Sequence, residues 1–196
     1  MIIRSVSNIY RQNVRSILLG GDHSITYPIT KGIQQEYPDF CILHLDAHSD
    51  TYPIYEGNIY SHACPFARIM EESLVSRLIQ VGIRTLTAEQ RQQIARFHIE
   101  VNEMKDWTDD IDLRLDLPVY LSVDLDVFDP AFAPGVAHHE PGGMTTRQVL
   151  NIIQRIPVPI LGADIVEYHP ARDHAGITGA LAAKLIKEIY AKMIVF

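Results

Sequence analysis

The sequence predicts an α/β fold in which a mainly parallel sheet is covered by helices on both faces, as a three-layer α/β/α sandwich. Short apolar runs rich in β-branched residues alternate with longer stretches of helical spacing. Several of these short runs lack polar alternation, which is typical of parallel strands buried on both sides. No internal repeat, low-complexity stretch or linker divides the chain, so residues 1–196 are expected to form a single domain.

The predicted strands and helices alternate along the chain. The strands are Ser16–Leu19, Cys41–Leu45, Leu78–Val81, Val119–Leu125 and Ile160–Val166. The helices are Ile25–Glu36, Pro65–Glu72, Ala88–Phe97, Thr146–Arg155 and Ile177–Met193. In the last helix, Leu181, Leu185 and Ile189 share one stripe, as expected of a helix with one face on a core. The Pro-rich and Gly-rich segment Asp129–Gly143 is predicted to be an irregular loop that forms a wall of a site.

The composition excludes several classes of protein. The chain has 24 acidic and 17 basic residues, a net charge of −7, and 47% hydrophobic residues. Such a chain is expected to fold, and its acidity argues against nucleic-acid and anionic-membrane partners. Cys41 and Cys64 form no C-x-x-C pair, and no stretch approaches the roughly 18 apolar residues of a membrane span. A cytoplasmic location is therefore expected.

Polar residues follow three of the predicted strands at the point where each strand ends. They stand in Gly20-Gly21-Asp22-His23-Ser24, Asp46-Ala47-His48-Ser49-Asp50 and Asp124-Leu125-Asp126. A single Asp at such a position is usually a helix cap, and a lone His is usually structural. The carboxyl ends of parallel strands meet at one edge, however, and several carboxylates buried there repel one another unless cations neutralise them. A pair of divalent metal ions would do so.

The residue types narrow the choice of metal. Imidazole with several carboxylates and no thiolate favours Mn²⁺ or a neighbouring transition ion over structural Zn²⁺ or Ca²⁺. Because side chains repeat every two residues along a strand, Asp46 and His48 point the same way, and so do Asp124 and Asp126. Two ions sharing such ligands would activate a water molecule, which indicates hydrolysis.

These motifs, extended to Ser122–Pro130, resemble in kind and order the signature stretches of the ureohydrolases, the arginase and agmatinase family. The resemblance implies two Mn²⁺ ions and hydrolysis of a guanidino group to urea and an amine. It implies six metal ligands, of which Asp46 and Asp124 bridge the ions: His23, Asp46, His48, Asp50, Asp124 and Asp126. It also implies three catalytic roles: Glu167 binds the substrate guanidinium, His62 shuttles a proton, and Asp126 holds a nitrogen of the intermediate.

Other stretches bear on the substrate. After Arg84 the chain lacks the Asp-Val-Asp-Pro run of animal-type arginases, whereas Glu56–Ala63, Phe66–Glu71 and Ala131–Val136 resemble plant-type arginases. Asp173–Thr178 reads more like an agmatinase. L-Arginine is therefore the favoured substrate, with L-ornithine and urea as products, and agmatine, which gives putrescine, is the alternative. A donor for the arginine carboxylate would come from one of three residues: Asn58, His138 or His139.

The chain is short for this family, since only 19 residues precede Gly20. The family generally has two further strands there, so Ser16–Leu19 is expected to be an exposed sheet edge, and either a homo-oligomer covers it or the protein is marginally stable. Two alternatives stay open. One is a metal-binding, non-catalytic shortened homologue with an assembly or regulatory role. The other is a related dinuclear hydrolase, such as a formimidoylglutamase or a guanidinobutyrase.

Overall fold

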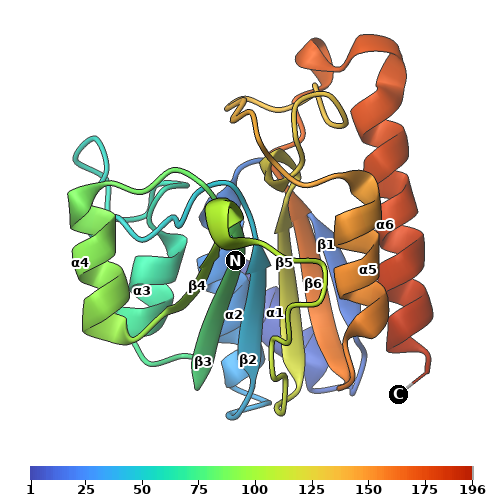
Figure 1. The fold of residues 1–196 in the computed structure, drawn as a ribbon. Helices are drawn as coiled ribbons and strands as arrows, with labels where there is room; N and C mark the ends of the chain where they lie inside the picture. Colours follow the sequence, from blue (N-terminus) through green and yellow to red (C-terminus); the bar gives the residue numbers. More distant parts are fainter. Residues whose placement is uncertain (196) are drawn as a thin grey trace.

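The structure is a computed structural model that describes residues 1–195. Its centre is a six-stranded sheet of order β1-β6-β5-β2-β3-β4 in which every paired neighbour is parallel (Figure 1). The strands are β1 (Ser16–Leu19), β2 (Cys41–Leu45), β3 (Arg77–Ile83), β4 (Glu100–Glu103), β5 (Val119–Asp124) and β6 (Ile160–Val166). The helices are α1 (Ile2–Tyr10), α2 (Thr26–Gln34), α3 (Pro65–Glu71), α4 (Ala88–Phe97), α5 (Thr146–Arg155) and α6 (Ile177–Met193).

The helices form a layer on each side of the sheet, which confirms the predicted sandwich. α5 and α6 pack on one face, and α1 to α4 pack on the other (Figure 1). Each face has its own apolar core, because alternate residues of a strand point to opposite sides. In β2, Cys41, Leu43 and Leu45 enter the α5 and α6 core, whereas Ile42 enters the other.

Most predicted elements are present, and two were missed. β1, β2, β6, α4, α5 and α6 have the predicted bounds. β4 was missed because strands were predicted from short apolar runs, and its sequence Glu-Val-Asn-Glu is polar. It can be polar because β4 is an edge strand that is partly exposed to water. α1 was overlooked although Val6 and Tyr10, four residues apart, are both buried against the second core.

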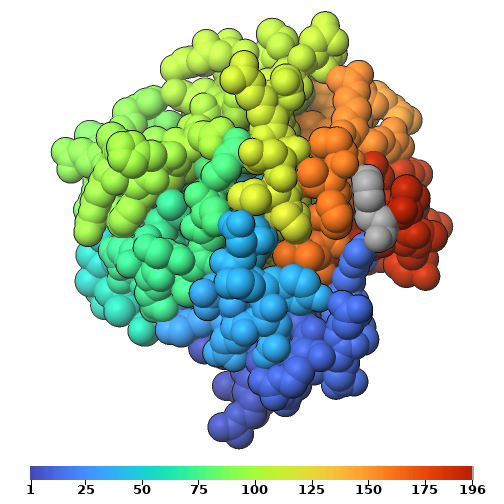
Figure 2. Space-filling view, turned by 90° about the horizontal axis from the view of Figure 1, so that it is seen from below, coloured from blue at the N-terminus to red at the C-terminus, as the bar shows by residue number. Residues whose placement is uncertain are grey.

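β1 lies at the other edge of the sheet, as predicted. Within residues 1–195 it pairs only with β6, and Leu19 is 66% exposed. The N-terminal segment lies beside the end of α6 (Figure 2), where Arg15 Nη1 donates to the carbonyl oxygen of Met193 at 2.5 Å. No helix within residues 1–195 has the length and apolar character needed to cross a membrane.

All six strands present their carboxyl ends at one edge of the sheet, where two irregular segments cover them. One segment, 46–64, joins β2 to α3, and the other, 128–145, joins β5 to α5. The second contains the predicted loop Asp129–Gly143, which is irregular as expected. A short 3-10 turn, Leu125–Val127, begins immediately after β5, and another, His23–Ile25, is separated from the end of β1 by three residues.

Candidate metal centre and active site

The structure brings all six predicted metal-ligating residues together at the carboxyl ends of β1, β2 and β5. Backbone N–H groups fix the orientation of three carboxylates. His48 N donates to Asp46 Oδ1 at 2.5 Å, Asp126 N donates to Asp124 Oδ1 at 2.8 Å, and Ala47 N donates to Asp126 Oδ1 at 3.1 Å. Each carboxylate therefore keeps its Oδ2 atom for the centre of the cluster.

One group of ligands surrounds His23. Its Nδ1 lies 3.1 Å from Asp50 Oδ2, 3.2 Å from Asp46 Oδ2 and 3.3 Å from Asp124 Oδ2. This nitrogen is buried and has no hydrogen-bond partner. Burial disfavours the charged ring, but the carboxylates of Asp124, Asp46 and Asp50 raise the pKa of His23 well above its ordinary value. The three carboxylates therefore favour a positive charge beside His23 Nδ1, which a bound cation would supply.

A second group of ligands surrounds His48. Its Nδ1 lies 3.0 Å from Asp126 Oδ2 and 3.5 Å from Asp46 Oδ1. Asp46 therefore presents one oxygen to each group, as a bridging ligand must. Burial opposes the charged ring, but Asp126 and Asp46 raise the pKa of His48 to about 12. His48 Nε2 faces Glu140 Oε1 at 3.7 Å, a partner that the motifs did not indicate.

Ionising all the carboxylates of the cluster at once costs free energy, because they are buried and repel one another. Burial, followed by repulsion from Asp126 and Asp46, raises the pKa of Asp124 well above its ordinary value. Burial and repulsion from Asp46 raise the pKa of Asp126 to about 7. Burial acts the same way on Asp46, but His44, His23 and His48 lower its pKa well below the ordinary range. A donor set of this kind, with imidazole nitrogens and excess carboxylate charge, fits divalent cations.

The cluster forms the floor of a cavity of about 180 Å³. Among the predicted residues, His62, His138 and Glu167 line it together with His48, Asp50, Asp124 and Asp126. Asn58 and His139 are not among the lining residues, so their predicted contact with the substrate stays a prediction. Asn58 Oδ1 instead accepts the Tyr60 N–H at 2.9 Å within its own loop, and His139 Nε2 lies 2.8 Å from the Pro134 carbonyl oxygen.

Glu167 enters the cavity from the end of β6. Its backbone has a φ of +65°, an uncommon left-handed conformation that a functional site can retain. Two contacts stabilise it: Glu167 N donates to the Gly21 carbonyl oxygen at 2.8 Å, and Glu167 Oε1 accepts the His23 N–H at 2.9 Å. Burial raises the pKa of this carboxyl group. The remaining carboxylate oxygen is available to a cationic ligand.

Aromatic rings form a further part of the cavity lining. The rings of His62 and His138 stack at 5.8 Å, and Tyr55 meets His62 edge to face at the same distance. Burial, and then the positive charges of His48 and His62, lower the pKa of His138. Tyr52, Ala63, Thr85 and Gln90 also line the cavity and were not predicted. Thr85 and Gln90 belong to the start of α4 and the turn before it, which only the tertiary fold brings to the segment that contains Tyr52 and Ala63.

Two buried networks behind the ligands were also missed. His23 Nε2 lies 2.9 Å from Ser122 Oγ, which donates to Asp164 Oδ1 at 2.7 Å. His44 Nε2 lies 2.7 Å from Asp46 Oδ2. The sequence carried a signal for both, because Ser122 and His44 each precede an aspartate of the cluster by two residues and so share its side of the strand.

A parallel α/β sheet whose carboxyl edge carries a cluster of histidines and carboxylates is typical of metal-dependent hydrolases. The Arginase family model matches residues 1–191, and the chain belongs to the arginase family. A mitochondrial arginase of Medicago truncatula is 47% identical over 92% of this chain and 56% of its own length. An agmatinase of Bacillus cereus is 31% identical over 96% of this chain and 67% of its own length.

Solved structures agree with this assignment. The arginase from Medicago truncatula superposes with a TM-score of 0.94 at 46% identity, over 98% of this chain and 64% of that chain. A T. brucei arginase-like protein triple mutant bound with Mn²⁺ superposes with a TM-score of 0.88 at 28% identity, over 98% of this chain and 65% of that chain. The chain spans about half the length of the curated plant arginases that it matches.

Proposed function

We propose that this protein is a dinuclear manganese ureohydrolase that hydrolyses L-arginine to L-ornithine and urea. The observation that carries the proposal is the pair of imidazole nitrogens, His23 Nδ1 and His48 Nδ1, each facing its own carboxylates and both facing Asp46. One ion would be held by His23, Asp46, Asp50 and Asp124. The other would be held by Asp46, His48, Asp124 and Asp126. The absence of thiolates from these donors supports Mn²⁺, which the related T. brucei mutant binds.

The residues of the cavity have separate roles in this proposal. When bound, the two cations supply a nucleophilic water that is deprotonated near neutral pH. The Glu167 carboxylate binds the substrate guanidinium and holds it over the cluster, and Asp126 accepts a hydrogen bond from a guanidinium nitrogen. His62 delivers a proton from its ring to the leaving amine, since it is an imidazole that lines the cavity and can act as a general acid there. The aromatic wall excludes bulk water from these groups.

The mouth of the cavity supports arginine over agmatine. The two compounds differ by one carboxylate, which needs a positively charged partner at the end of the cavity away from the cluster. Arg172 follows Glu167 closely in sequence, and its Nη1 donates to the Ala137 carbonyl oxygen at 2.6 Å. Arg172 is outside the lining of the cavity, but this contact holds its permanently charged guanidinium close enough to help lower the pKa of His138, which does line it. We propose that Arg172 and His138 bind the substrate carboxylate.

Substitution of Arg172→Gln tests this substrate preference. We expect KM for arginine to rise about five- to tenfold, because an exposed charge-assisted hydrogen bond is lost, with little change for agmatine. The measurement is a urea assay at varied concentrations of each substrate. Arg155→Gln is the matched control, because Arg155 Nη1 also donates to a backbone carbonyl oxygen, that of Asp109 at 2.7 Å, away from the cavity. Equal losses with both substrates would refute the role.

The proposed reaction is tested by incubating the Mn²⁺-loaded protein separately with arginine, agmatine and 4-guanidinobutyrate and measuring urea. We expect urea from all or some of them, and fastest from arginine. If agmatine is fastest, the enzyme is an agmatinase. No urea from any of the three would favour the alternative, a metal-binding but non-catalytic homologue.

His62→Ala provides the test of mechanism within this experiment. We expect the rate to fall about a hundredfold while the manganese content is unchanged, because His62 is a proton donor that contacts none of the cluster. His98→Asn is a suitable control, since His98 is an exposed histidine in a left-handed conformation at the end of α4, which Asn tolerates. An unchanged rate in His62→Ala would show that another group protonates the amine.

We also propose that a second copy of the chain covers the exposed edge of β1. The unpaired N–H and C=O groups of this strand and the exposed Leu19 favour association. Sedimentation velocity measures the oligomeric state, and a monomer of high thermal stability would argue against this part of the proposal.

A further inference from the structure

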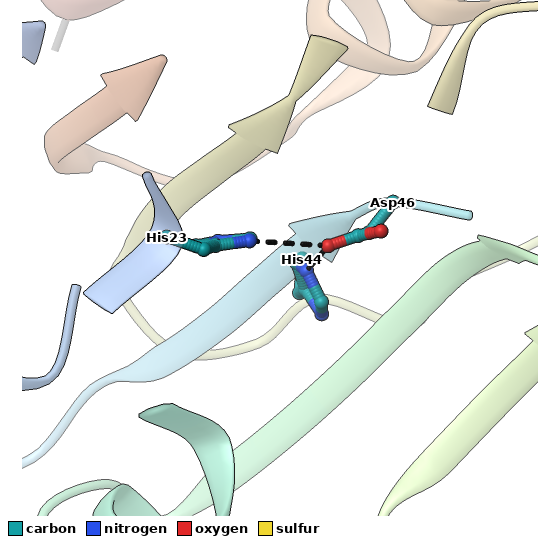
Figure 3. Close-up of side chains that lie close together, drawn as sticks. All are labelled: His23, His44 and Asp46. Carbon is teal, nitrogen blue, oxygen red and sulfur yellow. Dashed lines mark hydrogen bonds and ion pairs between the residues drawn. The ribbon is translucent and has the colours of Figure 1, made fainter. Parts of the chain in front are cut away.

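His44 is a fully buried histidine of β2 that contacts the cluster without belonging to the predicted ligands. Its Nε2 lies 2.7 Å from Asp46 Oδ2, and His23 Nδ1 approaches the same oxygen at 3.2 Å (Figure 3). His23, His44 and Asp46 thus have the residue types and proximity of a metal site. Whether His44 binds metal depends on which of its nitrogens carries a lone pair, and where that lone pair points.

The surroundings of Gln80 settle the position of the proton on His44. Gln80 Nε2 lies 2.7 Å from the Ser49 carbonyl oxygen, which can only accept a hydrogen bond, so this end of the side chain is the NH₂ group. Ser49 Oγ–H donates to Gln80 Oε1 at 2.7 Å, in agreement with that orientation. The same NH₂ group lies 3.0 Å from His44 Nδ1, so Nδ1 accepts. The proton of the neutral ring is then on Nε2 and is donated to Asp46 Oδ2.

Both nitrogens of His44 are therefore engaged, and neither has a free lone pair for a metal ion. The Phe66 ring stacks on His44 at 3.9 Å between ring centroids and limits rotation of the imidazole. On the basis of the proposed metal centre, we infer that His44 is a positioning residue rather than a ligand. It holds the bridging carboxylate of Asp46 by its Nε2–H, and Gln80 with Ser49 fixes the tautomer that makes this possible.

The geometry of Asp46 shows why such a residue matters. Its Oδ1 accepts the His48 N–H at 2.5 Å and faces the His48 group, and its Oδ2 accepts from His44 and faces the His23 group. The two hydrogen bonds together fix rotation about the bond between Cβ and Cγ. Without the His44 N–H, the Asp46 carboxylate can rotate about its remaining hydrogen bond from the His48 N–H. Its two oxygens then leave the positions in which one faces the His23 group and the other faces the His48 group.

The first test is Mn²⁺ binding to the metal-free full chain, measured by isothermal titration calorimetry. His44→Phe keeps the ring and its stacking on Phe66 but removes both nitrogens. We expect two Mn²⁺ ions to bind still, with affinity about 10- to 100-fold weaker, as is typical when a partner of a metal ligand is removed. Phe66→Leu is the control for packing, because it removes the ring that stacks on His44 and meets His23 edge to face but leaves every hydrogen bond, so we expect it to weaken Mn²⁺ binding less than His44→Phe does.

Each other outcome of the titration overturns the inference. A fall from two bound ions to one in His44→Phe would make His44 a ligand. Unchanged affinity would show that Asp46 needs no positioning. Equal weakening in Phe66→Leu would attribute the effect to packing. Failure of the unchanged protein to bind Mn²⁺ would overturn the proposed metal centre itself, and this inference with it.

The second test reads the tautomer directly and does not depend on metal or activity. In the ¹⁵N-labelled, metal-free protein, long-range ¹H–¹⁵N correlation spectra are expected to show His44 protonated at Nε2 alone. In Gln80→Glu, which has nearly the same shape, the atom beside Nδ1 is an oxygen; as the protonated carboxyl group it donates to the Ser49 carbonyl oxygen and accepts from Nδ1, so a proton is expected on that nitrogen. If His44 Nδ1 carries a proton in the unchanged protein, or if Gln80→Glu leaves the spectrum unaltered, the assigned relay is wrong.

Discussion

Asp126→Asn is expected to lower urea formation about a thousandfold and, at the same time, to stabilise the metal-free protein. The loss of activity follows from the position of Asp126. Its Oδ2 faces His48 Nδ1 at 3.0 Å in the second ligand group, and its side chain lines the cavity beside the proposed substrate site. A neutral amide at this position is a poor metal ligand and a poorer acceptor for a guanidinium N–H.

The gain in stability follows from the cost of burying the same carboxylate. Asp126 is only 3% exposed, and burial with repulsion from Asp46 raises its pKa to about 7. Relative to an ordinary aspartate near 4, this difference corresponds to at most about 4 kcal/mol of destabilisation above pH 7. Asn avoids that cost and keeps the hydrogen bond from Ala47 N. The Asp126→Asn variant also loses the attraction between the Asp126 carboxylate and the His48 ring, which reduces the gain in stability but is not expected to reverse it.

Two measurements check this prediction. Urea production by the Mn²⁺-loaded variant gives the rate, and thermal unfolding in EDTA near pH 8 gives the stability. Asp106→Asn is the control for a change of one charge, because Asp106 is exposed and outside the cluster. Unfolding of metal-free Asp126→Asn at a lower temperature than the unchanged protein would show that the carboxylate stabilises the fold without metal.

The two parts of the site differ in how well sequence predicts them, and the difference is physical. His23, Asp46 and Asp124 lie at the carboxyl ends of parallel strands, and those ends share one edge of the sheet, so their proximity follows from the order of elements. The structure does not place Asn58 in the cavity, because its side-chain oxygen accepts a hydrogen bond within its own loop. The proposed carboxylate-binding residue Arg172 was not predicted, because its place depends on a contact with Ala137, 35 residues earlier, that no local pattern encodes.

The supporting residues were missed for another reason. His44 and Gln80 lie within the predicted strands Cys41–Leu45 and Leu78–Val81, which were recognised by their apolar residues alone. Both side chains are buried in the structure. A polar residue in such a run costs free energy unless its hydrogen bonds are satisfied, so it is itself a signal of a buried network. Period-two alternation from Asp46 leads back to His44. No comparable rule leads from His44 to Gln80, because that pairing needs the register of β2 against β3.

Metal-free protein is expected to lose stability as pH rises from about 5 to about 8. Asp124 and Asp126 have raised pKa values in the folded state, so their contribution is fully present below about pH 4 and is lost as pH rises through the folded values. His23 and His48 also have raised pKa values, so their contribution is present below about pH 6.5 and declines above it. All four groups act in the same direction, and the lowered pKa values of His44 and His138 oppose them only up to about pH 6.5. The lowered pKa of Asp46 adds nothing over this range, because its contribution is already complete above about pH 4.

The size of this effect is measurable. Asp126 alone, with a pKa of about 7, accounts for about 3 kcal/mol between pH 5 and pH 8, which lowers the melting temperature of a chain of this size by about 5 to 10 °C. Mn²⁺ is expected to act in the opposite direction, because its ligands must be deprotonated and binding strengthens as pH rises. Thermal unfolding across this range, in EDTA and in saturating Mn²⁺, tests both statements. A metal-free melting temperature that rises with pH would contradict the first.

The two predictions constrain each other through Asp126. If repulsion among buried carboxylates causes the pH dependence, then metal-free Asp126→Asn must show a shallower fall in melting temperature from pH 5 to pH 8 than the unchanged protein. It must also gain less from Mn²⁺ at pH 8, since one ligand is missing. A variant that is more stable at every pH, with the same slope, would have gained its stability from packing. The slope therefore separates the electrostatic explanation from a steric one, and it does so without any measurement of activity.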